Sequence, residues 1–100
     1  MIRADVIELI KENPTSHGAF DAPAELLREV MCTVASIGMT EMYTAMSQGL
    51  NPQYRFTLAL AEDYGNERQL VYHGERYRII RTYINGDGIE LTCERVTGDV

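Results

Sequence analysis

Few side chains of this 100-residue chain are spaced so that they could do chemistry together. The two histidines, His17 and His73, lie far apart, and neither has a cysteine, aspartate or second histidine at the spacing of a metal site. The two cysteines, Cys32 and Cys93, each lie in an apolar run without a Cys-x-x-Cys pattern. We therefore expect surface histidines and buried free thiols, and a disulfide only if the fold brings the two cysteines together.

Sequence signatures of catalysis are also missing. No Gly-x-Ser-x-Gly, His-Glu-x-x-His, P-loop or Gly-x-Gly-x-x-Gly pattern occurs. Neighbouring carboxylates such as Glu62 and Asp63 sit beside a turn, not in an apolar wall that could raise a carboxyl pKa for acid–base work. We expect no catalytic residue, no metal and no cofactor, and we predict that the protein is not an enzyme.

One segment near the C-terminus combines basic and aromatic side chains. It interleaves three arginines with three tyrosines: Arg76, Arg78, Arg81, Tyr72, Tyr77 and Tyr83. On a barrel, such a surface can bind single-stranded nucleic acid by base stacking and phosphate pairing. The chain, however, has 15 acidic and 9 basic residues and a net charge of −6, and we expect Glu90 and Glu94 to neutralise the arginines across the sheet. We therefore favour tyrosines that fill a core or an interface.

Length and composition limit the architecture. One hundred residues, of which 45% are hydrophobic and 24% charged, suffice for one hydrophobic core but not for two. No run approaches the roughly 18 apolar residues of a membrane span, and Arg3 and Asp5 interrupt the start, where a signal peptide would be apolar. We predict a single domain over residues 1–100, kept in a cytoplasm and without a membrane partner.

Apolar patterning predicts strands over residues 4–12 and 24–37, joined by a long loop over residues 13–23. The loop has prolines, a glycine and no hydrophobic period. About eleven residues without structure exceed the usual connection in a compact domain, so the loop is either functional or mobile. Phe20 at its far end is an apolar side chain with no evident core.

A short helix is predicted over residues 39–49, with Thr40 as its N-cap. Its apolar side chains fall on one face, at the spacing i, i+3, i+4 and i+7: Met39, Met42, Tyr43 and Met46. Two or three turns are too short to persist alone, so we expect this face to pack on a sheet. The alternative is an adaptable docking surface of the kind that methionine favours.

Four more strands are predicted over residues 54–61, 69–72, 76–84 and 89–94, with hairpin turns at 73–75 and 85–88. Six strands and one short helix would expose a large apolar face if the sheet were flat, whereas a barrel buries that face. The predicted fold is mostly β: a small six-stranded β-barrel with one short α-helix between strands 2 and 3 and a long loop between strands 1 and 2.

Five segments together carry a family pattern. They are VASIGMTEMY at 34–43, GLNP at 49–52, YRFTL at 54–58, YHGERYRIIRTY at 72–83 and IELTCERV at 89–96. In this order they resemble the head closure, or head–tail connector, proteins of long-tailed bacteriophages. Glu41 and Tyr43 match a Glu–aromatic pair on the family's helix. The matches to its Y-x-G-x-R-Y-R-I motif are Tyr72, Gly74, Arg76, Tyr77 and Arg78.

The resemblance implies a small barrel with a helix and a structural role in the virion. Copies of such a protein form a ring beneath the portal and adaptor at the capsid vertex, retain the packaged DNA and offer a docking face to the tail. The partners implied are the portal–adaptor ring and a tail terminator or tail-completion protein. Double-stranded DNA would pass without sequence-specific binding. We expect a chain that is monomeric when free, assembles in the host bacterial cytoplasm and becomes a homo-oligomer at the head–tail interface.

Two sets of candidate residues follow from this resemblance. The family carries its gate in the loop between the first two strands, which makes the candidate gating or interface residues Pro14, His17, Gly18, Phe20 and Asp21. The candidate subunit or partner interface comprises Glu41, Tyr43, Arg76, Arg78 and Arg81. An acidic surface would also repel DNA phosphates and keep friction in such a ring low.

Two other functions stay open at this point. A tail-completion protein on the tail side of the joint can use the same kind of small barrel. An oligonucleotide-binding barrel would use the basic and aromatic segment at 72–83.

Overall fold

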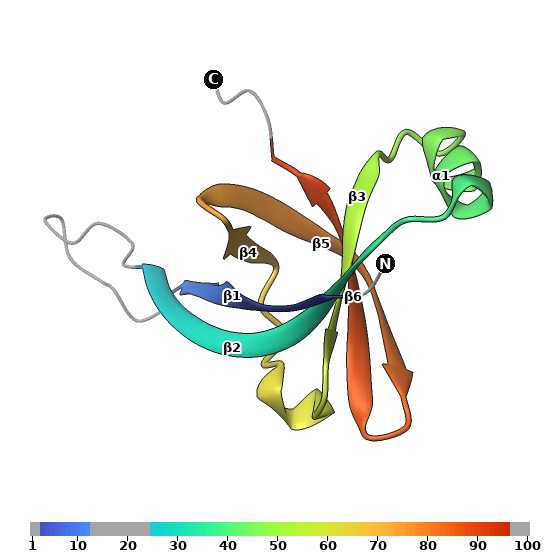
Figure 1. Ribbon diagram of the computed structural model, residues 1–100. Coiled ribbons are helices and arrows are strands. Elements are labelled where there is room, and N and C mark those ends of the chain that lie inside the picture. The colour runs from blue at the N-terminus through green and yellow to red at the C-terminus, as the bar shows by residue number, and fades with distance from the viewer. Residues whose placement is uncertain (1–2, 13–24, 97–100) are drawn as a thin grey trace, which may run out of the picture.

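The structure is a computed structural model that describes residues 3–12 and 25–96 (Figure 1). Its elements, in chain order, are β1 (Arg3–Glu12), β2 (Glu25–Ser36), α1 (Met39–Met46), β3 (Pro52–Leu58), the 3₁₀ helix η1 (Ala61–Asp63), β4 (Gln69–Tyr72), β5 (Glu75–Asn85) and β6 (Gly88–Arg95). The predicted loop at 13–23 lies outside the described residues.

The six strands form one closed antiparallel barrel in the order β1-β2-β3-β6-β5-β4. Residues 69–71 of β4 return to pair with residues 8–10 of β1 and complete the circle. Closure leaves few unpaired strand edges and turns one face of every strand inward. The prediction of a mostly-β, six-stranded barrel with one helix between the second and third strands is confirmed.

β1 and β2 form a ribbon that is longer than the barrel wall (Figure 1). β1 pairs with β2 along its whole length, from Arg3 opposite Val34 to Glu12 opposite Glu25. β2 pairs with β3 only over residues 33–36, so its first part runs beyond β3. The Cα radius of gyration is 14.5 Å, above the roughly 13 Å of a compact 100-residue domain, as expected when strands project from a small core.

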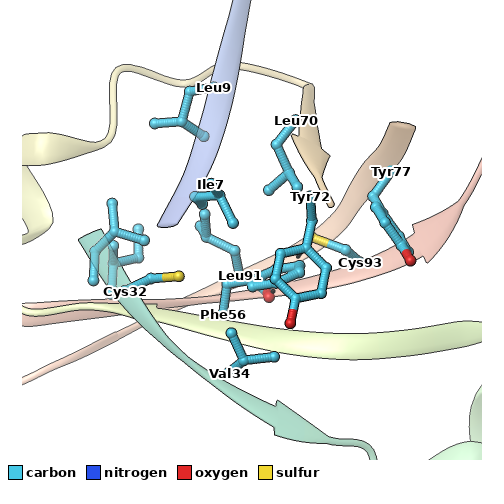
Figure 2. Close-up of a cluster of buried hydrophobic side chains, with 12 residues drawn as sticks. Ile7, Leu9, Cys32, Val34, Phe56, Leu70, Tyr72, Tyr77, Leu91 and Cys93 are labelled. Carbon is cyan, nitrogen blue, oxygen red and sulfur yellow. Dashed lines mark hydrogen bonds between the residues drawn. The ribbon is translucent and has the colours of Figure 1, made fainter. Parts of the chain in front are cut away.

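The core is built from the inward positions of all six strands, as Figure 2 shows for most of its members. It comprises Ile7, Leu9, Cys32, Val34, Phe56, Leu58, Leu70, Tyr72, Tyr77, Ile89, Leu91 and Cys93. Aromatic rings from three strands meet edge to face in and against it: the ring centre of Phe56 lies 5.0 Å from that of Tyr72, and the centre of Tyr54 lies 5.7 Å from that of Tyr77. The interior is therefore filled by side chains.

Both predicted hairpin turns are confirmed. β4 and β5 are joined by His73 and Gly74, with φ of +51° and +80°, the left-handed conformations that a tight two-residue turn needs. β5 and β6 are joined through Gly86, with φ of +65°. Positive φ fits the twist of the flanking strands, which explains why glycine recurs at these turns.

The helix begins where it was predicted, but its N-cap and its C-terminal end differ from the prediction. It begins at Met39 and its N-cap is Gly38, which has no side chain to donate or accept a capping bond, so the prediction of Thr40 as N-cap is wrong. The helix ends at Met46, and residues 47–49 form a turn instead of a further helical turn. No helix among residues 3–12 and 25–96 is long and apolar enough to cross a membrane.

Gly88 is required by close packing where β6 meets the end of β3. A Cβ atom at this position would lie 2.5 Å from the carbonyl oxygen of Leu58 and 3.2 Å from that of Ala59. We expect Gly88→Ala to lower the free energy of unfolding by about 2 kcal/mol, because backbone must move to admit the methyl group. Urea denaturation measures this loss.

Gly38→Ala is the matched control, since nothing lies within 4 Å of a Cβ at Gly38 and its φ of −69° suits alanine. We expect it to cost less than about 1 kcal/mol, the loss that an N-cap change brings. Equal losses for the two variants would contradict this account of Gly88.

Candidate interaction surface

Helix α1 turns its apolar stripe away from the barrel. No residue of the helix is buried, and Met39, Tyr43 and Met46 are 69%, 63% and 55% exposed. The prediction that the Met and Tyr face packs on a sheet is therefore wrong. Helical periodicity shows that one face is apolar, but it does not show what covers that face.

The opposite face of α1 is held to the barrel by charge. Glu41 accepts hydrogen bonds from Arg55 of β3 and Arg81 of β5. Nε of Arg55 also lies 3.6 Å from a carboxylate oxygen of Glu90 on β6. One helical carboxylate is thus shared by guanidinium groups of two strands, which fixes the side of the helix that faces inward.

A groove of about 260 Å³ separates this inner face from the barrel wall. Its lining residues are Glu41, Thr44, Ala45, Gln48, Leu50, Pro52, Ile80, Arg81 and Thr92. Residues 41, 44, 45 and 48 fall on the side of the helix opposite Met39, Tyr43 and Met46. The helix is therefore amphipathic, with its polar side on the protein and its apolar side in water.

The tyrosines of the basic and aromatic segment do not form one surface. Tyr72 and Tyr77 are core residues, at 3% and 6% exposure, whereas Tyr83 is 61% exposed on the projecting part of β5. The interpretation that tyrosines fill the core is confirmed for the first two. Only Tyr83 among these three is available for stacking on a base.

The arginines of the segment each have a partner within the chain. Arg78 forms an ion pair with Glu94, whose other oxygen accepts a hydrogen bond from the backbone N–H of Asn51 at 3.0 Å. Arg76 donates to the side-chain oxygen of Gln69 at 2.7 Å. The expected pairing across the sheet is thus confirmed for Glu94.

For Glu90 the expected pairing is wrong. In the β5–β6 register this residue faces Tyr83, and its carboxylate approaches Arg55 of β3 instead of Arg76 or Arg78. β6 pairs with β5 along one edge and with β3 along the other, and β3 brings Arg55 close to Glu90. The local sequence does not show which strands lie beside β6.

The candidate interface residues thus fall into separate places. The structure joins Glu41 to Arg81 and places Tyr43 on the outer side of the same helix. Arg76 and Arg78 lie farther back along β5 with their own partners. The candidate gating residues lie outside the described residues: Pro14, His17, Gly18, Phe20 and Asp21.

No sequence pattern indicates a polar cluster that forms around Asp5. One carboxylate oxygen of Asp5 lies 3.1 Å from the hydroxyl of Tyr72, which donates to it, and 3.0 Å from Nε2 of His73. The Tyr72 hydroxyl accepts a hydrogen bond from Arg3 at 2.5 Å, and the His73 ring stacks on Tyr72. The backbone N–H of Val6, which donates at 2.8 Å, is the main cause that lowers the pKa of Asp5.

An Asp–His pair can orient a general base, but the neighbouring thiol is not activated. Cys32 faces Asp5 across the β1–β2 ladder, and burial raises its pKa to about 11. Burial raises the pKa of Cys93 further. Both cysteines are buried and free, as predicted, and both remain protonated at neutral pH.

A polar hollow of about 470 Å³ lies beside β4, lined by Ile10, Lys11, Gly65, Asn66, Glu67, Arg68, Gln69 and Arg78. The side chain of Glu67 is 2% exposed. Burial acts to raise its pKa, but hydrogen bonds from Arg28 at 2.9 Å and from the backbone N–H of Gly65 at 2.7 Å hold the pKa below its usual value. Glu67 is therefore an ionised buried carboxylate with a structural partner.

Lys11 and Arg68 at this hollow form no ion pair with a carboxylate in the described parts of the chain. Across residues 3–12 and 25–96, no three His, Cys, Asp or Glu side chains gather closely enough to hold a metal ion. No protein-family model and no curated protein matches the chain.

The outward face of α1 is the strongest candidate interaction surface, because several apolar side chains gather there in contact with water.

The ion pairs of Glu41 can be tested by hydrogen exchange. Glu41→Ala removes the acceptor of both Arg55 and Arg81, so α1 should detach from the barrel more often. We expect its amides to exchange about fivefold faster, the effect of a partly exposed ion-pair network. Exchange in β3 and β6 should change little.

Glu62→Ala is the matched control, because Glu62 is exposed and has no ion pair within the described residues. It should leave the exchange of α1 unchanged. Equal protection of α1 in the wild type and in Glu41→Ala would show that other contacts hold the helix.

Thiol labelling tests the burial of the cysteines. The rise of the Cys32 pKa from 9.0 to about 11 lowers its thiolate fraction at pH 8 about a hundredfold. We expect both cysteines to react slowly with an aromatic disulfide reagent in the native state and rapidly in urea. Native labelling should accelerate as the pH rises toward 11, and rapid native labelling at pH 8 would contradict the burial.

Proposed function

We propose that this protein is a structural subunit of a tailed bacteriophage head–tail joint, acting as a head closure protein. In this role copies form a ring beneath the portal and adaptor, retain packaged DNA and present a face to the tail. The element order supports the proposal: a six-stranded barrel, a helix between β2 and β3, and a long connection between β1 and β2 are what the family resemblance implies.

The observation that carries the proposal is the outward apolar face of α1. Met39, Tyr43 and Met46 would stay in water if the chain worked alone, and a contiguous exposed apolar patch marks an interaction site. Methionine and tyrosine are also enriched where proteins meet. A subunit of a ring needs such a face because it contacts neighbours on more than one side.

The polar clusters are consistent with a structural role. The Asp5–His73 pair ties the first strand to the β4–β5 turn, and the ionised Glu67 ties the turn after η1 to Arg28 of β2. Each pair joins residues far apart in sequence. Their effect is to stiffen the barrel from which the helix projects.

The nucleic-acid alternative receives less support. Two of the three tyrosines that could stack on bases are buried, and Arg78 and Arg81 bind carboxylates. Retention on single-stranded DNA that falls steeply with salt would favour this alternative. The tail-completion alternative uses the same surfaces and differs only in the side of the joint that is occupied.

Imaging of capsid vertices tests the proposal. Purified protein is added to DNA-filled capsids that carry the portal and adaptor, and we expect a new ring of density at the vertex together with slower loss of DNA. A variant with Tyr43→Ser and Met46→Ser should add little density, because it keeps the buried core but loses the apolar stripe. Glu62→Gln serves as a surface control that should behave like the wild type.

Two outcomes would count against the assignment. Binding to isolated tails but not to capsids would favour the tail-completion alternative. Binding to neither particle, with the protein folded, would remove the connector role altogether.

A further inference from the structure

A second exposed apolar surface lies at the tip of the β5–β6 hairpin. β5 pairs with β4 only up to Arg78, so beyond this point β5 is paired with β6 alone. Residues 81–87 are all exposed, and Tyr83 and Ile84 are 61% and 65% exposed. Because consecutive residues of a strand point to opposite faces, the tip holds one large apolar side chain in water on each of its two faces.

Charge distinguishes these two surfaces from the exposed apolar residues of β2. Between Ser36 and Gln53 the only charged residue is Glu41, and its carboxylate is bound on the inner side of the helix. Residues 82–86 carry no charge. In contrast, the exposed apolar residues of β2 lie among charges, with Arg28 and Glu29 between Leu27 and Met31.

The distribution of charge limits which surfaces of two copies of this acidic chain can come into contact. Each copy has a net charge of −6, so two copies repel one another unless their contact surfaces are uncharged or complementary in charge. The α1 stripe carries no charge, and residues 82–86 of the hairpin tip carry none either, although Asp87 follows them in the turn. They are therefore the surfaces on which two copies can approach at least electrostatic cost.

We infer that the outer face of α1 docks on the tip of the β5–β6 hairpin of a second copy. The inference rests on the proposed function, since it names the contact between neighbours in the ring. In Figure 1 the helix lies at the upper right and the hairpin tip at the lower right, so the two surfaces are separate. A contact between two different surfaces is heterologous and passes from copy to copy, which is the kind of contact that generates rings.

The side chains suit one another chemically. The sulfur atoms of Met39 and Met46 can lie against the ring of Tyr83, a favourable contact for a thioether. Tyr43 offers an aromatic surface to Ile84 or to a tyrosine ring. Flexible methionines also adapt to a projecting tip without a preformed pocket.

The size of the contact explains why it would need an assembly. Three side chains on one copy and two on the other cover less than the roughly 800 Å² per partner of a stable complex. The contact is therefore weak but present between free chains at high concentration, and it strengthens when copies are held side by side. This agrees with the expectation of a chain that is monomeric when free and oligomeric in the virion.

Disulfide trapping in the full chain tests the contact. One protein carries Thr40→Cys beside the α1 stripe, and a second carries Asn85→Cys at the hairpin tip. Thr33→Cys on β2 replaces Thr40→Cys as the matched control, since both threonines are exposed. The native Cys32 and Cys93 do not interfere, because they are buried.

At about 0.1 mM of each protein, a real contact raises the local thiol concentration into the millimolar range, so we expect roughly tenfold more mixed disulfide for Thr40→Cys with Asn85→Cys than for the control pair. Adding Tyr43→Ser to the Thr40→Cys protein should bring the yield down to the control level. Equal yields for the two pairs would overturn the inference, as would a larger yield for the β2 pair.

The trapping and the capsid experiment fail independently. A ring on capsids without the Thr40–Asn85 disulfide would reject this contact and keep the proposed function. The disulfide without binding to capsids or tails would reject the proposed function and keep a self-association surface on α1.

Discussion

Three cross-strand pairs between β1 and β4 close the barrel, and the rest of the structure depends on them. Residues 8–10 face residues 69–71 at this seam, which joins parts of the chain about sixty positions apart. The seam brings Leu9 and Leu70 into the same core and sets Asp5 beside His73. Without closure, the inward faces of all six strands would be exposed to water.

Because the barrel buries its own core, the helix is not needed to cover it. α1 is attached through the carboxylate of Glu41 and the guanidinium groups of Arg55 and Arg81, while its apolar stripe remains outside. Such ion pairs contribute little stability when they are partly exposed, but they orient the helix. The fold thereby separates a rigid scaffold from surfaces that other molecules can bind.

Much of the fold follows from local patterns. Apolar patterning and β-branched residues predicted the strands, and the glycine-containing turns predicted both hairpins, because these signals act over a few neighbouring residues. The burial of Cys32 and Cys93 followed from their apolar surroundings in sequence. The identity of strand neighbours did not follow, so Glu90 was assigned to the wrong arginines, and the Asp5–His73 pair had no signal at all.

The sequence by itself determined that six strands and one amphipathic helix would form. Only the tertiary structure decided which way the helix faces. The physical reason is that amphipathicity is a property of the helix alone, whereas its orientation depends on which barrel groups lie beneath it. Here Arg55 on β3 and Arg81 on β5 both bind Glu41, the one carboxylate of α1. This pairing leaves Met39, Tyr43 and Met46 on the outer side of the helix.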